Sequence, residues 1–112
     1  MKYQRRILAA GRYEAVCISA EEKLSKNGKE MIEMRWEADG CEVKGYLTPA
    51  MGWIIDQIKT ACGFDLDTNA ESDITPKDIL GKRALIDITC EMFNDQPQNK
   101  ISKYLPSSLP PV

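Results

Sequence analysis

Three lysines surround an Asn-Gly dipeptide in the stretch EEKLSKNGKEMIEMRWE, residues 21–37. Lys23, Lys26 and Lys29 each end in an ammonium group, a compact charge that binds phosphate. Asn27-Gly28 is a strong signal for a tight turn between two strands. The pattern therefore predicts a β-hairpin with a positively charged tip. Two interpretations fit such a tip: a contact surface for nucleic-acid phosphates, or a solvated turn that protects an exposed sheet edge.

Acid–base and nucleophilic chemistry have little support in the sequence. The chain contains no histidine, the residue that most often serves as a general base or metal ligand. Carboxylates that share a strand face, such as Asp87 and Glu91, look solvated in this pattern, whereas a catalytic carboxylate needs a perturbed pKa. The sequence shows neither a nucleophile–base pair nor a glycine-rich phosphate loop. We therefore expect no catalytic residue and no cofactor.

Four cysteines are present, and their spacing argues against a metal site. Cys17, Cys41, Cys62 and Cys90 are far apart in the sequence, so no Cys-x-x-Cys pair of a zinc site occurs. Each lies in an apolar stretch, where cysteine usually packs as a small buried side chain. We expect all four thiols to be reduced and free of metal.

The totals are those of a single globular domain. The chain has 112 residues, 43% hydrophobic and 29% charged, with a formal net charge of −2. No apolar run approaches the roughly 18 residues of a membrane span, and the N-terminal ILAA is too short for a signal-peptide core. We expect a cytoplasmic protein with a basic N-terminal arm at 1–10, a folded domain at 11–105 and a proline-rich, extended tail at 106–112.

Alternating apolar and polar residues predict five strands. The strands are expected at 12–19, 30–38, 41–47, 82–93 and 99–105. After the third strand, apolar residues recur every three or four positions, which predicts a helix over 49–62. A short helix follows in TPKDILG, where Thr75 and Asp78 form a capping box. We therefore expect a mainly β, OB-fold-like Greek-key barrel with one main helix between strands three and four, although other α+β folds share this order of elements.

The same periodicities predict which side chains enter the core. The inward side chains are expected to be Ala84, Ile86, Ile88, Cys90 and Met92 in the fourth strand and Ile101, Lys103 and Leu105 in the fifth. Tyr104 is expected to point outward from the fifth strand, or to cover the end of the barrel. Trp36 and Trp53 lie on apolar stripes, which favours core positions over exposed stacking platforms.

Two segments resemble a family of small phage and prophage proteins. The stretch GRYEAVCISAEEKLSKNGKEMIEMRWE (11–37) is similar to that family's opening, a Gly-x-Tyr-x-Ala strand that leads into a Lys-Ser-Lys-x-Gly hairpin. The stretch LGKRALIDITCEMFNDQPQNKISKYLP (80–106) is similar to its ending. The resemblance implies an OB-fold protein that binds single-stranded DNA as an accessory in replication or recombination. The turn NDQPQ departs from the family pattern, and the chain lacks an acidic C-terminal tail, so tail-mediated recruitment of partners is not expected.

An OB-fold places its ligand at a defined surface. Oligonucleotides lie across the second and third strands, between the loops that join strands one to two and four to five. Lysines there would bind phosphates and aromatic rings would stack on bases. The expected nucleic-acid-binding residues are Lys23, Lys26, Lys29, Arg35, Lys44, Tyr46, Phe93, Lys100 and Tyr104. Glu33, Glu37 and Glu42 share the outer face of strands two and three, where they would repel phosphate or pair with these cations.

Two functions stay open at this point. The first is a sequence-tolerant binder of single-stranded DNA, or of RNA, that works with phage or host replication and recombination proteins in a bacterial or phage-infected cell. The second is a protein-binding adaptor that uses the mixed-charge face or the proline-rich tail of the same barrel. A shift of an oligo-dT strand at low salt distinguishes them.

Overall fold

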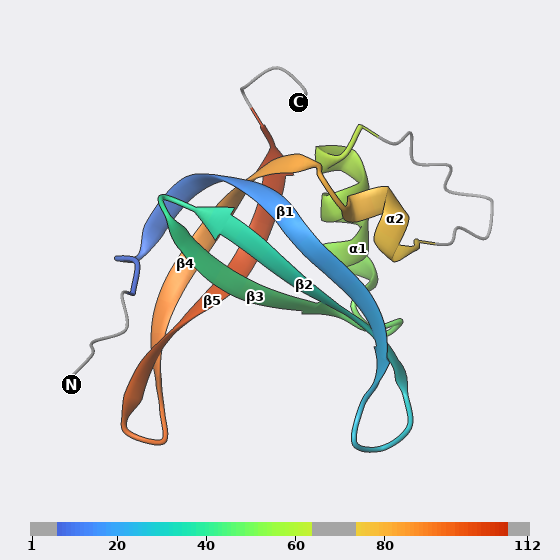
Figure 1. Cartoon of the computed structure of the whole chain (residues 1–112), viewed down its shortest axis with the longest axis horizontal. Coiled ribbons are helices and arrows are strands. Elements are labelled where there is room, and N and C mark those ends of the chain that lie inside the picture. Colours follow the sequence, from blue (N-terminus) through green and yellow to red (C-terminus); the bar gives the residue numbers. More distant parts are fainter. Residues whose placement is uncertain (1–6, 64–73, 108–112) are drawn as a thin grey trace.

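The computed structural model describes residues 7–63 and 74–107, and within them the side chain of Phe93 is not described. The chain is mainly β, with five strands, a ten-residue helix and a single helical turn (Figure 1). The elements in order are β1 (Gly11–Leu24), β2 (Glu30–Ala38), β3 (Cys41–Leu47), α1 (Gly52–Ala61), α2 (Pro76–Ile79), β4 (Arg83–Phe93) and β5 (Gln96–Pro106). The predicted class, five strands with the main helix between the third and the fourth, is confirmed.

The strands form one antiparallel sheet in the order β3-β2-β1-β4-β5. The central strand β1 pairs with β4 through its first half and with β2 through its second half. Among the described residues no ladder joins β3 to β5, so the sheet is not closed and these strands are its edges. The two edges nevertheless approach each other, because the hydroxyl of Tyr104 in β5 lies against Gly45 in β3.

Three tight turns connect the paired strands. Asp39 and Gly40 both have positive φ (48° and 76°) and join β2 to β3 as the Asp-Gly signal predicts. In the lysine hairpin, Ser25 accepts a backbone hydrogen bond from Gly28 at 2.9 Å, and Gly28 alone takes positive φ (75°). The β4–β5 turn consists of Asn94-Asp95, with φ of 51° and 61°. The predicted start of the last strand at residue 99 is therefore wrong, since β5 begins at Gln96.

Two irregularities change which residues face the core. Ile18 in β1 has no partner in β2, because Cys17 pairs with Trp36 and Ser19 with Arg35. On β5 the extra residue is Ser102, whose hydroxyl donates to the backbone oxygen of Asp87 at 3.2 Å. A bulge of one residue reverses the inward and outward sides of the strand beyond it.

The Ser102 bulge explains why the prediction for Tyr104 was wrong. Ile101 pairs with Ile88 and faces the core, as expected. Beyond the bulge Tyr104 pairs with Ile86 and is also buried, at 3% exposure, whereas Lys103 is exposed. The ring of Tyr104 packs on that of Trp36, with 5.6 Å between centroids. Tyr104 is therefore a core residue, and it is not part of an outer binding face.

The helices cover one end of the curved sheet (Figure 1). α1 buries Ile54 and Ile58 against the core, which confirms the predicted apolar stripe. Trp53 lies one position outside that stripe and is 64% exposed, so its predicted core position was wrong. Thr75 and Asp78 form the predicted capping box of α2, because the Asp78 carboxylate accepts from the Thr75 N–H at 2.9 Å.

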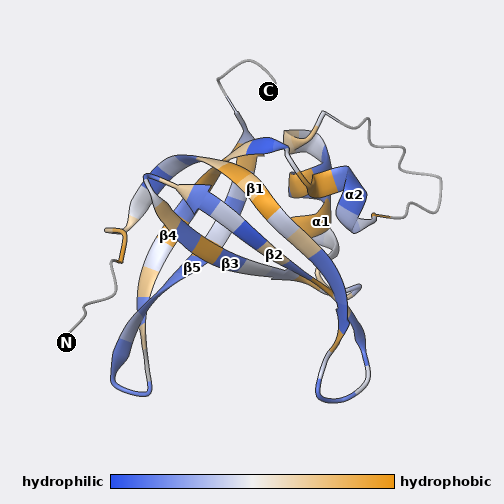
Figure 2. Cartoon of the chain, viewed as in Figure 1, coloured by the Kyte–Doolittle hydropathy of each residue, from blue (hydrophilic) through white to orange (hydrophobic). Residues whose placement is uncertain are grey.

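The β4–β5 hairpin extends beyond the body of the sheet, and its end is largely hydrophilic (Figures 1 and 2). Cys90 is exposed and Met92 is 69% exposed, so both inward predictions were wrong. The alternation of β4 continues into this hairpin, but within residues 7–63 and 74–107 no second layer buries Met92 there. Ala84, Ile86 and Ile88, nearer the centre of the sheet, are buried as predicted.

The segment before β1 is held by the C-terminal half of the chain. Leu8 is 4% exposed, and its backbone exchanges two hydrogen bonds with the side-chain amide of Asn99, at 2.9 and 2.8 Å. Leu8 falls inside the stretch predicted as a basic arm (1–10), so packed structure includes part of that stretch. Residues 1–6 of the predicted arm and residues 108–112 of the predicted tail lie outside the described residues.

Candidate nucleic-acid interface

The lysine hairpin presents two accessible ammonium groups. Lys26 and Lys29 are exposed at its tip, where the Lys29 N–H donates to the hydroxyl of Ser25 at 3.1 Å and fixes the turn. Neither lysine has an ion-pair partner within the described part of the chain. Both are therefore available to an external anion.

Lys23 is placed differently, at the base of the hairpin. Its ammonium donates to the Glu33 carboxylate at 2.7 Å across the β1–β2 ladder, and Glu21 lies at 4.0 Å. The hydrogen bond from Lys23 lowers the pKa of Glu33, and the same bond raises the pKa of Lys23. Of the three predicted lysines, Lys23 must exchange this partner before it can bind a phosphate.

The outer face of β2 and β3 carries the predicted cations and one aromatic ring. Arg35 and Lys44 are directly opposite each other in the β2–β3 ladder, and Tyr46 is opposite Glu33. All three predicted residues are exposed, Tyr46 at 44%. Like charges in facing positions repel each other, and no described carboxylate pairs with Arg35 or Lys44. Strand alternation predicted this face correctly.

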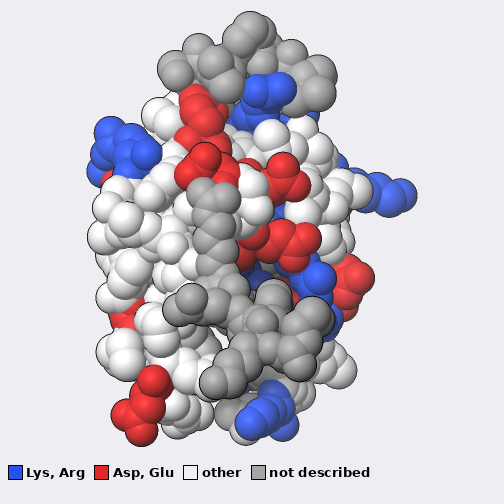
Figure 3. Space-filling view, turned by 60° about the vertical axis from the view of Figure 1, so that its left-hand side comes forward, with Lys and Arg blue, Asp and Glu red and all other residues white. Residues whose placement is uncertain are grey.

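Acidic residues share the same face. Glu37 is directly opposite Glu42, and Glu21 is directly opposite Glu33. On the side of the molecule drawn in Figure 3, acidic and basic side chains are interspersed without a continuous basic surface. The phosphate backbone of a nucleic acid bound on this face must therefore contact individual cations and avoid these carboxylates.

The predicted residues of β4 and β5 are dispersed. Lys100 is exposed near the β4–β5 hairpin, with the Glu91 carboxylate at 3.9 Å. Phe93 lies at the end of β4, and its side chain falls outside the description. Tyr104 is buried. The two hairpins project from the sheet in the same direction (Figure 1), so Lys100 and the lysine hairpin lie on two extensions of one side of the molecule.

Another ion pair, Arg12–Asp87, lies on the outer side of β1 and β4. Arg12 donates to both oxygens of Asp87, at 2.7 and 3.2 Å. The hydrogen bond from Arg12 lowers the pKa of Asp87 below its ordinary value. Arg12, one of the N-terminal basic residues, is therefore already paired with a carboxylate. Lys103 is directly opposite Asp87 in the β4–β5 ladder and adds a smaller effect in the same direction.

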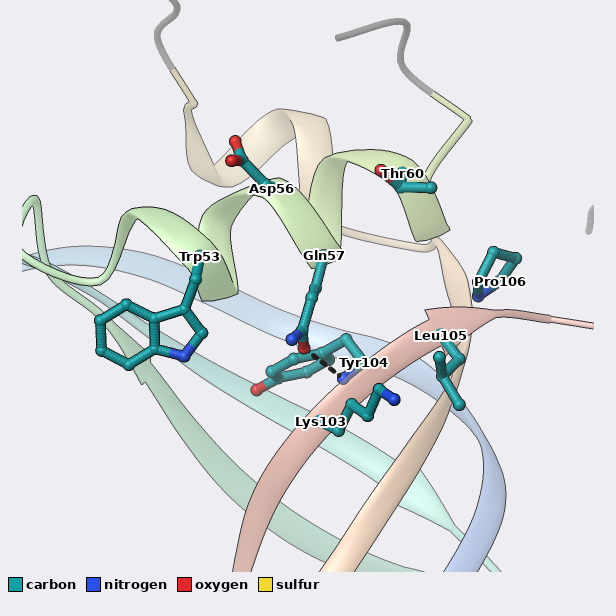
Figure 4. A pocket seen from close by; sticks show the side chains of 8 residues that line it. All are labelled: Trp53, Asp56, Gln57, Thr60, Lys103, Tyr104, Leu105 and Pro106. Carbon is teal, nitrogen blue, oxygen red and sulfur yellow. Dashed lines mark hydrogen bonds between the residues drawn. The ribbon is translucent and has the colours of Figure 1, made fainter.

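Two cavities border these elements. One of about 660 Å³ lies at the base of the lysine hairpin, where charged Glu22, Lys23 and Glu30 surround an apolar floor. The other, a groove of about 260 Å³, lies between α1 and β5 (Figure 4). The exposed Trp53 and Lys103 line this groove. Sequence reasoning missed both residues, because Trp53 was assigned to the core and Lys103 to the inner side of β5.

The comparisons with known proteins leave the family open. No protein-family model and no curated protein matches the sequence. The resemblance to small phage and prophage proteins therefore stays a prediction. In the described part of the chain, neither helix is long and apolar enough to cross a membrane.

Proposed function

We propose that this chain is an OB-fold protein that binds single-stranded DNA with little sequence preference. The strand order supports this assignment. An OB-fold is a partly open Greek-key barrel of five strands, and here a five-stranded antiparallel sheet brings its two edge strands together at Gly45 and Tyr104. The main helix follows β3, as the proposed layout requires.

The observation that carries the proposal is a set of cations without partners. Lys26, Lys29, Arg35 and Lys44 have no ion-pair partner in the described part of the chain, and they lie on the hairpin and strands that an OB-fold uses for oligonucleotides. The exposed ring of Tyr46 adds a stacking surface. Sequence-tolerant binding requires cations along the path of the nucleic-acid backbone and aromatic rings that can stack on any base.

The proposed biological setting rests on the resemblance to small phage and prophage proteins. We assign the protein to phage DNA replication or recombination in a bacterial or phage-infected cytoplasm, with phage or host replication proteins as partners. RNA is the competing ligand, because phosphate contacts and stacking do not by themselves exclude it.

A salt-dependent titration tests the proposal. Replacing Lys26 and Lys29 with glutamate should weaken binding to labelled oligo-dT strongly. Each phosphate contact contributes roughly 0.7 to the slope of log affinity against log salt for single strands, so two lost contacts should reduce the slope by ~1.4. Anisotropy titrations at several salt concentrations measure both quantities, and oligo-U and duplex DNA establish the preference among nucleic acids.

The control changes the net charge equally at a different place. Lys77→Glu with Lys82→Glu alters two exposed lysines, one within α2 and one shortly after it, on the helical side of the molecule. If the lysines of the hairpin act through contact, only the hairpin variant should lower affinity and slope together. If both variants lose the same affinity, the effect comes from the change in net charge. If the hairpin variant binds oligo-dT as tightly as the wild type, the hairpin is not part of the binding site.

The glutamates favour a second candidate, a protein-binding adaptor. Glu37 opposite Glu42 is an unfavourable cross-strand pair, and a partner with basic side chains would relieve this repulsion. Failure of the wild-type protein to bind any single strand at low salt would favour this adaptor over the DNA-binding function.

A further inference from the structure

Trp53 is exposed although it belongs to a short, well-packed helix. Its side chain is 64% exposed, whereas Trp36, the other tryptophan, is fully buried. A tryptophan side chain has a large apolar area, and in folded proteins it is usually either buried or in contact with a ligand or partner. The neighbours Ile54 and Ile58 take the inward side of α1 and leave Trp53 on its flank.

The groove beneath Trp53 has a fixed floor (Figure 4). Gln57 accepts a hydrogen bond from the backbone N–H of Tyr104 at 3.0 Å, which joins α1 to the edge of β5. The Tyr104 ring is held from below by Trp36. The indole of Trp53 therefore projects from a rigid support, and a ring that stacks on it needs no rearrangement of the floor.

The chemistry of the groove suits one nucleotide. Its volume is about 260 Å³ and most of its exposed lining is apolar. Lys103, exposed on β5, supplies a cation on the wall of the groove opposite α1 (Figure 4). The carboxylate of Asp56 and the hydroxyl of Thr60 point away from Trp53 and Lys103 in the same view.

The groove also continues the proposed binding face. Tyr46, the exposed ring of β3, is the neighbour in sequence of Gly45, and Gly45 contacts the hydroxyl of Tyr104, which lines the groove. A strand that crosses from β3 to β5 at this point reaches Tyr104, which lines the groove together with Trp53. No ladder between β3 and β5 obstructs this route among the described residues.

We propose that one base of the bound single strand stacks on Trp53 and that Lys103 binds a phosphate of the same segment. This subsite rests on the proposed DNA-binding function and extends its path from β3 to the groove between α1 and β5. The subsite also accounts for the exposure of Trp53, which packing of the core does not explain.

Intrinsic fluorescence provides a direct test, because the two tryptophans differ completely in exposure. Saturating oligo-dT should quench the emission of the exposed indole and protect it from iodide. The Trp53→Phe variant retains only the buried Trp36, so its emission should not respond to the strand. Anisotropy with a labelled strand confirms that the strand is bound in each case.

Affinity measurements complete the test. Trp53→Ala should bind oligo-dT about 5- to 140-fold more weakly, the range for one lost stacking contact, and its salt slope should stay unchanged. Trp53→Phe should retain most of the affinity. Lys103→Gln should lower the slope by roughly 0.7. Leu80→Ala removes another exposed apolar side chain, 51% exposed, and should have no effect.

Two results would overturn the subsite, and they are distinguishable. If oligo-dT binds while Trp53 stays accessible to iodide and Trp53→Ala binds like the wild type, the groove is not on the path and the DNA-binding function stands. If the wild-type protein binds no single strand at all, the function and the subsite fail together.

Discussion

Replacing Gly45 with alanine tests the closest approach of the two edge strands. A Cβ atom at this position would lie 2.5 Å from the hydroxyl oxygen of Tyr104, 3.1 Å from Cε of Met34 and 3.6 Å from Cδ1 of Ile101. The first distance is far below van der Waals contact. Gly45 is therefore required where a side chain from β5 meets the backbone of β3.

Tyr104 has little freedom to move away. It is 3% exposed, it packs on Trp36, and its N–H is held by Gln57. Overpacking a filled core typically costs about 1–3 kcal/mol, and we expect Gly45→Ala to lower the free energy of unfolding within that range. The contact with the Met34 methyl is milder, because a methionine side chain adapts easily.

A second substitution separates the clash from other effects. Tyr104→Phe removes the oxygen at 2.5 Å, and every other Tyr104 atom lies at least as far from the new Cβ as the 3.6 Å contact of Ile101. The double variant should therefore be more stable than the sum of the two single changes predicts, by most of the cost of Gly45→Ala. Such a coupling energy is the measure of a direct interaction.

Urea denaturation followed by circular dichroism gives the four free energies of this cycle. Gly52→Ala is the matched control, since no heavy atom lies within 4 Å of its Cβ position, and alanine in a helix should be neutral or more stable by roughly 0.5–1 kcal/mol. If Gly45→Ala unfolds like the wild type, or if Tyr104→Phe relieves none of its cost, the described contact between β3 and β5 is wrong.

Two further predictions follow from the titratable groups. The hydrogen bond from Arg12 lowers the pKa of Asp87 from its ordinary value of 3.8, so this carboxylate stabilises the fold above that pH and loses its contribution as the pH falls through the lowered value. Arg12→Gln should raise the pKa of Asp87 in an NMR titration, and an unchanged value would contradict the ion pair. Burial raises the pKa of Cys17 to about 11 and also raises that of Cys62, whereas Cys90 is exposed. At pH 8 a thiol reagent should therefore react first with Cys90, the fast phase should disappear in Cys90→Ser, and rapid labelling of Cys17 would contradict its burial.

Regular alternation was sufficient to predict the β2–β3 half of the fold. The observed bounds Glu30–Ala38 and Cys41–Leu47 agree with the predicted ranges. In these strands every second residue is buried, and the Asp39-Gly40 turn adds no irregularity. The outward positions of Arg35, Lys44 and Tyr46 followed from the same pattern, and this part of the candidate site was predictable for that reason.

The remaining errors have two physical causes. A bulge leaves no clear sign in the residue types, so the extra residue Ser102 reversed the predicted orientation of Tyr104. Periodicity also shows which side of a strand or helix carries the apolar residues, but it does not show whether another part of the chain covers that side. Met92 lies on a hairpin that extends past the sheet, and Trp53 flanks a helix whose inward stripe is already filled by Ile54 and Ile58.

The divided pairing of β1 has a consequence for the order in which the chain can fold. The second half of β1 pairs with β2, which follows it directly, whereas the first half pairs with residues 83–88 of β4. The bonds between Leu8 and Asn99 join residues 91 positions apart. On the ribosome, the β1–β3 meander can therefore form early, but one edge of β1 stays open until the C-terminal strands emerge. Closing such long loops is slow, because their entropy is lost before the distant contacts compensate for it.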